Sequence, residues 1–351
     1  MALKPLRVRP DLVMFAGRFA QYLLKRNLQH LIAHVTNHCN FRCQHCFIDF
    51  SPKRDLKLEH YEKLGRQAGK LFWLDIAGGE PFLRTDIADI VACFDARVIQ
   101  IPTNGSLQDR IIERVKEMQK RIDGEVAISF SLDGLESTHE EIRKAPGNWN
   151  QVWDTFEKLR ELGGINIKIN TCLHQGNVDE ILPLMKEVRA RKPDFHSIIL
   201  LRGEPMNPEV GLPPFEVLNE IAPKIFEILE TYDYGQGKLT ARILRNYHRY
   251  LWNVSLQTIR QKTQVVPCLA GSAHMVVMGN GDVSSCEMLP PVGNVKETSF
   301  AEVVGSSAMR EQVQFIQDKK CFCTHNCAML DSILFRPASI PHLMSEKIKP
   351  G

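Results

Sequence analysis

Apolar and polar positions alternate in two ways through the first two thirds of the chain. Short apolar runs, as long as β-strands, are separated by longer segments in which apolar residues recur at helical spacing. This alternation is typical of parallel βα units, in which a helix follows each strand. The predicted strands are 31–36, 71–77, 98–103, 126–131, 165–171 and 197–201, and the predicted helices between them are 57–69, 84–94, 107–120, 149–163 and 178–192.

Six strands alternating with helices predict an α/β fold with a parallel barrel, either closed or partial. In such a barrel the residues that carry chemistry lie where the strands end, because the loops after the strands meet at one face. Polar residues at the predicted strand ends are therefore the first candidates for a functional site.

The last third of the chain has a different pattern. Four prolines within 203–216 predict a linker, and two helices are expected at 216–232 and 239–262. The segments 274–278 and 283–286 flank the sequence Gly279-Asn280-Gly281-Asp282. This predicts a β-hairpin, because Asn-Gly tolerates the positive φ of a tight turn. A further helix is expected at 299–315.

The N-terminal segment predicts an amphipathic helix that packs on the main domain. Basic residues interrupt its apolar stripe, so a helix lying on a membrane surface is the alternative interpretation. The stripe consists of Leu12, Phe15, Phe19 and Leu23, and the basic residues are Arg18, Lys25 and Arg26.

Composition narrows the class of protein. Of 351 residues, 44% are hydrophobic and 24% charged, which is ordinary for a globular protein and argues against disorder. The net charge of +3 gives no reason to expect a nucleic-acid partner. No run of 18 apolar residues predicts a transmembrane helix, and the first residues lack the order of a signal peptide, so we expect a cytoplasmic protein. In that compartment ten cysteines indicate metal or redox chemistry and not disulfides.

The first cysteine cluster is Cys39, Cys43 and Cys46, directly after the first predicted strand. Three thiolates within eight residues can hold one inorganic centre. A four-iron cluster held by three cysteines leaves one iron open to an external ligand. The alternatives are zinc, with His45 as fourth ligand, and a loop without metal.

The spacing C-x3-C-x2-C after the first strand of a βα domain resembles the radical S-adenosylmethionine (SAM) superfamily. The resemblance implies a partial (βα)6 barrel in which these three cysteines hold a [4Fe-4S] cluster and the open iron binds SAM. It further implies reductive cleavage of SAM to a 5′-deoxyadenosyl radical, with electrons from a flavodoxin- or ferredoxin-type donor. Either His45 or Phe47 is then expected near the adenine.

The same resemblance implies a set of cofactor-binding residues at successive strand ends. The segment from Gly78 to Pro81 is expected to hold the methionyl amino group, with two glycines for close approach and Glu80 as acceptor. The full set is Phe47, Gly78, Gly79, Glu80, Pro81, Asn104, Ser131, Asp133, Arg143 and Asn170. Arg202 and Glu204 follow the sixth strand and are candidates for substrate contact, with a surface salt bridge as the alternative. Cys93 and Cys172 are expected to be buried core thiols.

The second cysteine cluster lies in the C-terminal part of the chain. Cys268 and Cys286, with Gly281 five residues before the second of them, resemble the opening of SPASM and Twitch extensions, which hold auxiliary iron–sulfur clusters. The spacing departs from the full SPASM pattern, and five cysteines are too few for two clusters. We therefore expect one auxiliary [4Fe-4S] cluster, with a structural zinc site as the alternative. The five candidate ligands are Cys268, Cys286, Cys321, Cys323 and Cys327, one of them spare.

The resemblance predicts an enzyme of the oxidoreductase type that abstracts hydrogen from a small-molecule, lipid or glycan substrate. Net oxidation or bond formation would use the auxiliary cluster. The alternatives are a peptide-modifying maturase, a redox-neutral epimerase and a non-catalytic iron–sulfur maturation protein. The sequence names neither the substrate nor the abstracted hydrogen. The expected organisation is an N-terminal helical segment (1–30), the radical SAM barrel (31–205), a linker with helices (206–263), a smaller α+β auxiliary-cluster domain (264–335) and a tail (336–351).

Overall fold

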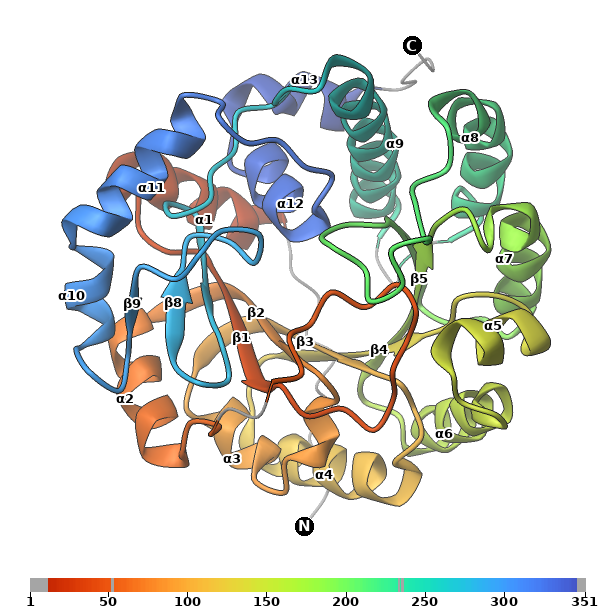
Figure 1. Cartoon of the computed structure of the whole chain (residues 1–351), viewed down its shortest axis with the longest axis horizontal. Helices are drawn as coiled ribbons and strands as arrows, with labels where there is room; N and C mark the ends of the chain where they lie inside the picture. Colours follow the sequence, from red (N-terminus) through yellow and green to blue (C-terminus); the bar gives the residue numbers. More distant parts are fainter. Residues whose placement is uncertain (1–11, 52–53, 233, 235–236, 346–351) are drawn as a thin grey trace.

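The six predicted strands lie in one sheet and are parallel to one another (Figure 1). A computed structural model describes residues 12–51, 54–232, 234 and 237–345. The strand order β6-β5-β4-β3-β2-β1-β7-β8-β9 places six consecutive parallel βα strands side by side, which confirms the partial barrel. These strands are β1 (His30–Thr36), β2 (Lys70–Gly78), β3 (Asp95–Thr103), β4 (Glu125–Ser131), β5 (Asn166–Leu173) and β6 (Phe195–Leu200).

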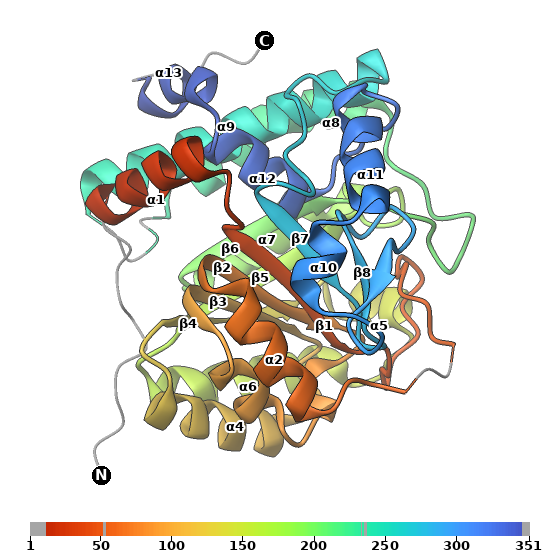
Figure 2. The same cartoon turned by 90° about the vertical axis from the view of Figure 1, so that its left-hand side faces the viewer.

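Helices cover the outer face of this sheet (Figures 1 and 2). They are α2 (Leu58–Ala68), α3 (Ile87–Ala92), α4 (Gln108–Arg121), α5 (Glu136–Arg143), α6 (Asn148–Leu162) and α7 (Ile181–Ala190), with short 3₁₀ turns η1 (Pro81–Leu83) and η2 (Val178–Glu180). Helix α5 was not predicted. Its one large apolar residue is Ile142, so it shows no apolar stripe at helical spacing.

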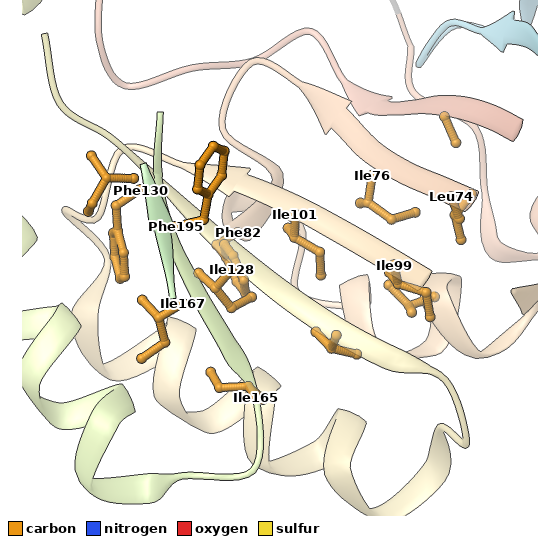
Figure 3. Packing of buried hydrophobic residues seen from close by; sticks show 14 of the residues in the cluster. Leu74, Ile76, Phe82, Ile99, Ile101, Ile128, Phe130, Ile165, Ile167 and Phe195 are labelled. Atoms are coloured by element: carbon orange, nitrogen blue, oxygen red, sulfur yellow. The ribbon is translucent and has the colours of Figure 1, made fainter. Parts of the chain in front are cut away.

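The core lies between the outer face of the strands and these helices. Figure 3 shows Leu74 and Ile76 of β2 and Ile99 and Ile101 of β3 on that side of the sheet. Alternate residues of a strand point to opposite faces, so the residues between them point into the barrel. Side chains on the outer face therefore pack against the helices, whereas side chains on the inner face can line a cavity.

The C-terminal part continues the same sheet. The predicted hairpin is formed by β7 (His274–Val277) and β8 (Asp282–Ser284), and β7 pairs in parallel with β1, His274 opposite His30. The cysteines that flank the hairpin are thus fixed against the first strand of the barrel. The remaining elements are α8 (Phe215–Leu229), α9 (Lys238–Gln261), β9 (Gly293–Asn294), α10 (Phe300–Val304), α11 (Ser307–Gln317), α12 (Asn326–Leu334), η3 (Pro337–Ser339) and α13 (Ile340–Met344).

Two segments differ from expectation. The single helix predicted at 299–315 is two helices, because the backbone becomes extended at Ser306, which caps α11 by accepting a hydrogen bond from the Met309 N–H at 3.1 Å. The segment expected to be a tail contains η3 and α13, and Leu343 of α13 packs with Tyr247 of α9. Residues 346–351 lie outside the described part of the chain.

Helix α1 (Leu12–Lys25) packs on the main body, as the amphipathic pattern predicts. Its Phe15 ring lies 5.8 Å from Phe72, and its Tyr22 ring lies 5.2 Å from Phe335. Phe15, Phe19 and Leu23 of the apolar stripe are thereby partly buried against the chain itself, whereas the side chain of Leu12 lies outside the described part. Residues 1–11 of the predicted N-terminal segment lie outside the described residues. None of the helices in the described ranges is long and apolar enough to cross a membrane.

A buried ionic network ties the auxiliary part to the barrel. His30 of β1 lies 2.8 Å from Asp331 of α12 and 3.2 Å from Asp75 of β2. His274 of β7 lies 3.1 Å from the same Asp331 oxygen. Burial opposes protonation of His30, but Asp331 and Asp75 outweigh it and raise the pKa of His30 to about 10. The network therefore joins three strands and one helix through charge.

We expect this network to make stability depend on alkaline pH. An unfolded histidine has a pKa of about 6.5, so the stabilisation from charged His30 is complete below that value and is lost as pH rises toward about 10. His30→Gln should lower the free energy of unfolding by about 3 kcal/mol at neutral pH, the scale for breaking a buried ion pair. The same substitution should also make the free energy of unfolding fall less steeply between neutral and alkaline pH. Anaerobic denaturant unfolding at several pH values measures both, and equal slopes in the two proteins would contradict the assignment.

Candidate active site

A cavity of about 220 Å³ opens at the C-terminal ends of the barrel strands. Three cysteines line it, together with nine of the ten residues predicted to bind the cofactor. Five different strands and the loops after them contribute these residues, so their convergence depends on the fold. The lining set from the predictions is Cys39, Cys43, Cys46, Phe47, Gly78, Gly79, Glu80, Asn104, Ser131, Asp133, Arg143 and Asn170.

The cysteine loop follows β1 and is fixed by backbone and side-chain contacts. The Gln44 N–H donates to the Ile142 carbonyl at 2.8 Å, and the Asn104 side chain donates to Asn40 at 2.9 Å. Burial raises the pKa of Cys43 to about 12, although Arg143 opposes the shift. A metal or iron centre is what turns such buried thiols into thiolates, so the loop fits the group that the spacing implies.

The two glycines after β2 are required by close contact with the start of the cysteine loop. A Cβ on Gly78 would lie 2.2 Å from the Thr36 carbonyl oxygen, and Gly78 has φ of +128°. A Cβ on Gly79 would lie 2.2 Å from the His38 carbonyl oxygen. Any side chain would therefore push the glycine turn away from Cys39. The glycines keep two walls of the cavity in contact.

Glu80 is buried behind this turn. One carboxylate oxygen accepts from the Phe82 N–H at 3.1 Å and from the Thr103 hydroxyl at 2.9 Å, and the other accepts from the Asn104 N–H at 2.7 Å. A carboxylate can accept about four hydrogen bonds, so one position remains for a donor in the cavity. Burial raises the pKa of Glu80 to about 7, and the three hydrogen bonds oppose that shift.

Asp133 and Arg143 form a buried pair on the opposite wall. Two guanidinium nitrogens of Arg143 lie 2.8 Å from the same Asp133 oxygen, and the Cys172 N–H donates to the other oxygen at 2.8 Å. Burial alone would raise the pKa of Asp133, but Arg143 holds it well below its usual range. The pair therefore stays ionised and presents a fixed dipole to the cavity.

Some predicted residues lie elsewhere. Pro81 begins η1 and does not line the cavity, and Glu204 is exposed outside it. Arg202 does line the cavity, and its guanidinium lies 4.9 Å from the centre of the Phe47 ring. Of the two candidates for substrate contact, the structure thus places Arg202 alone at the cavity wall. His45 also lies there, stacked on His174 at 5.7 Å.

Two residues of the cavity wall were not identified from sequence. Cys172 was expected in the core, but it lies on the inner face of β5 and lines the cavity. His34 of β1 also lines it. Strand alternation is the signal that would have found Cys172, because it lies two residues after Asn170 and therefore on the same face of β5. Cys93, in contrast, is half-buried at the end of α3 and packs on the core.

A second cavity, of about 230 Å³, lies between the hairpin, α11 and α12. Cys268, Cys286, Cys321 and Cys323 all line it, and its other walls are mostly apolar. Cys327 does not line it. The Cys327 sulfur points toward the barrel instead, 3.4 Å from Asp75. The structure therefore brings four of the five C-terminal cysteines together and separates the fifth.

The four thiols of the second cavity suit an iron–sulfur cluster, which binds cysteine thiolates. In the described part of the chain, no three His, Cys, Asp or Glu side chains come close enough together to hold one metal ion. Zinc also binds four thiolates, each about 2.3 Å from the ion, so the iron and zinc contents of the protein distinguish the two centres. The residues present thus fit an iron–sulfur cluster in each cavity.

A chain of buried side chains connects the two cavities. Glu287 lines the first cavity and directly follows Cys286 of the second. It lies 2.7 Å from His34 and also pairs with His325, which lines the second cavity. Burial alone would raise the pKa of Glu287, but His325 and His34 hold it well below its usual range. A carboxylate and two imidazoles thus bridge the sites.

Family models match both parts of the chain. The radical SAM superfamily model matches residues 34–188, and the SPASM iron–sulfur cluster-binding domain model matches residues 268–328. The chain belongs to the radical SAM superfamily. The first match contains the cysteine loop and most residues of the first cavity, and the second contains the hairpin and the four converging cysteines. This radical SAM protein therefore binds SAM with one [4Fe-4S] cluster and carries auxiliary iron–sulfur binding in its SPASM domain.

Relatives of this radical SAM protein have different activities. GTP 3′,8-cyclase of Marinobacter nauticus is 30% identical over 48% of this chain and 52% of its own length. The subtilosin biosynthesis protein AlbA of Bacillus subtilis is 22% identical over 79% of this chain and 59% of its own length. The chain thus spans only part of these relatives.

Solved structures share the fold. SuiB of Streptococcus suis superposes with a TM-score of 0.62 at 16% identity, covering 89% of this chain and 75% of SuiB. The structure of anSMEcpe with bound AdoMet superposes with a TM-score of 0.60 at 16% identity, covering 83% of each chain. At this identity the likeness supports the architecture and says nothing of the substrate.

Proposed function

We propose that this radical SAM protein abstracts a hydrogen atom from a small-molecule, lipid or glycan substrate, and that its auxiliary cluster takes up an electron to give net oxidation or bond formation. When bound, the SAM-ligated cluster supplies the electron that cleaves SAM to the 5′-deoxyadenosyl radical. The observation that carries the proposal is the connection of the two cysteine-lined cavities through His34, Glu287 and His325. A substrate whose reacting carbon reaches the first cavity would lie beside a route to the second.

The residues of the first cavity divide into three groups. Cys39, Cys43 and Cys46 would hold the cluster. Glu80 would accept a hydrogen bond from the SAM amino group, and the ionised Asp133–Arg143 pair would orient the polar end of the cofactor. Arg202, on its ring contact with Phe47, would contact substrate.

His34 would receive the proton that an oxidation releases. Its Nε2 is held by Glu287, and its Nδ1 is buried without a hydrogen-bond partner among the described residues. Oxidation of a carbon radical releases one electron and one proton, and this arrangement provides neighbouring acceptors for both. Epimerisation would need no electron acceptor, so the connected second cavity favours oxidation.

A peptide-modifying activity is the second candidate. The relatives favour it, because AlbA is a bacteriocin biosynthesis protein and SuiB has been solved with its precursor peptide. Anaerobic incubation of the reconstituted protein with SAM, dithionite and deuterated substrate pools separates the two candidates. Deuterium in 5′-deoxyadenosine from a small-molecule pool supports the proposal, and transfer from peptides alone overturns the substrate class.

Glu80→Ala should weaken SAM binding by about 1.5–3 kcal/mol, the range for a charged hydrogen-bond partner. The physical reason is the loss of an acceptor in the cavity, together with loss of its three bonds to the strand ends. Anaerobic calorimetry on protein of matched iron content measures the change. Glu59→Ala on the exposed side of α2 is the control. A dissociation constant equal to that of the wild type would show that Glu80 has only a structural role.

A further inference from the structure

The inner face of this barrel carries polar and charged side chains among apolar ones. A filled parallel barrel packs its interior with branched apolar side chains. Here Asp75 of β2, Gln100 of β3 and Lys168 of β5 all line the interior instead. Polar groups in such a position are normally hydrogen-bonded, because burying them unpaired costs free energy. Asp75 already bonds His30 and Trp73, so the unused polar capacity of the interior lies in its other residues, beside a largely apolar wall.

These residues line a cavity of about 240 Å³ between the strands and helices α9 and α12. Asn170 and Ile199 line both this cavity and the first cavity, at the strand ends. The two spaces thus adjoin, and a molecule in the interior would lie directly beneath the cofactor site. We call the interior space the barrel cavity.

Two charged residues deep in the barrel cavity have unused hydrogen-bonding capacity. The Lys168 ammonium has three donors, and its one hydrogen bond within the described residues is a long one of 3.4 Å to Gln100. Glu125 bonds Asn166 through one oxygen, while its other oxygen is buried with no hydrogen-bond partner in the described part of the chain. A donor and an acceptor thus face the same space. Burial also lowers the pKa of Lys168 and raises that of Glu125, so a ligand that bonds both would relieve a real cost.

The chemistry of the occupant follows from this combination. A hydroxyl group both accepts and donates, so neighbouring hydroxyls satisfy Lys168 and Glu125 together. A phosphate would meet the carboxylates of Asp75 and Glu125, and an apolar molecule would leave both groups unsatisfied. Trp73 and Tyr247 add aromatic surface on the wall, which suits the apolar edges of a saturated ring. The volume is below the roughly 300 Å³ of pockets for larger ligands, and fits one ring better than a peptide.

We propose that the barrel cavity is the substrate pocket and that it binds a polyhydroxylated ring, a sugar or cyclitol, through Lys168 and Glu125. This proposal rests on the proposed function, since it places the substrate beneath the SAM site. Lys168 and Glu125 are positioning residues, because they hold the ring without touching the reacting atoms.

The test uses the reconstituted full chain with SAM and dithionite. The added probe is the small-molecule filtrate of an extract of the source cells, used untreated, periodate-treated or protease-treated. Periodate cleaves vicinal diols, and protease removes peptides. The readout is 5′-deoxyadenosine formed above the basal level without filtrate. The variants are Lys168→Met and Glu125→Gln, with Lys186→Met and Glu161→Gln on exposed helix positions as matched controls.

We expect the untreated filtrate to stimulate 5′-deoxyadenosine formation, periodate to abolish the stimulation and protease to leave it. Both pocket variants should lose stimulation by about tenfold or more, the scale for losing a hydrogen bond to a charged group. Their basal formation should equal that of the controls, which shows that they fold and bind SAM. Stimulation that survives periodate, that protease removes, that never occurs, or that both pocket variants retain would overturn the proposal. Absence of basal formation in the wild type would instead contradict the proposed function.

Discussion

Replacing Cys39, Cys43 and Cys46 together by alanine is expected to abolish reductive cleavage of SAM. The three thiols line one cavity with Glu80 and the Asp133–Arg143 pair, and nothing else in that cavity offers three sulfur ligands. Without them the open iron that binds SAM has no support. The variant should keep about four of roughly eight irons, because the auxiliary cavity is separate. Anaerobic iron analysis and chromatography of 5′-deoxyadenosine measure both quantities.

The control for this triple variant is Cys93→Ala. Cys93 lies at the end of α3, outside both cavities, so its loss removes a thiol without removing a proposed ligand. The Cys93→Ala variant should have the same iron content and the same rate of SAM cleavage as the wild type. Cleavage at the wild-type rate in the triple variant would sink the assignment of these cysteines, even if the iron content fell.

The repeating part of the fold was predictable because local pattern determines it. Each strand of the barrel is an apolar run between two amphipathic segments, and the observed strands differ from the predicted ones by one to three residues at their ends. The cysteine loop was predictable for a similar reason, since its three ligands lie within eight residues. Helix α5 was missed because a short, mostly polar helix has little apolar periodicity, and the break at Ser306 was missed because apolar residues recur in the helices on both sides of it.

What the sequence could not predict depends on contacts between distant segments. The pairing of β7 with β1 brings Glu287 to His34, 253 residues earlier in the chain. Neither residue has a local signal for that contact. The position of Cys172 was missed because its neighbours in sequence suggest a core strand, and the inner face of the barrel became known only with the fold. Which C-terminal cysteines line the second cavity likewise depends on the orientation of α12, which turns Cys327 toward Asp75 in the barrel.

The assignment of Cys327 as the cysteine that does not bind the auxiliary cluster can be tested with single substitutions. Cys327 lies beside Asp75 and outside the second cavity, so Cys327→Ala should keep wild-type iron. Cys323→Ala, four residues away, should lose iron from the auxiliary site. Equal loss in both variants would show that Cys327 is a ligand and that its position changes when the cluster binds.

Replacing Cys268 and Cys286 together by alanine is expected to separate cofactor cleavage from product formation. These two thiols come from opposite ends of the hairpin and form one side of the second cavity, so their loss should remove about half of the roughly eight irons. The first cavity keeps its three cysteines, so 5′-deoxyadenosine should still form slowly. Oxidised product should not form, because an electron left on a substrate radical has no fully thiolate-ligated cluster to accept it.

The same double variant decides the reaction class. In a redox-neutral reaction no electron leaves the substrate, so the variant would still complete the reaction. In a net oxidation the radical of the variant takes one electron from dithionite and one proton from water, so substrate returns with a hydrogen that comes from the solvent. Mass spectrometry of substrate recovered from deuterated buffer distinguishes these results. Deuterated substrate without product supports oxidation through the auxiliary cluster, whereas full product formation assigns the chain to redox-neutral chemistry. Wild-type iron near four per chain, with zinc present, would make the second cavity a structural zinc site.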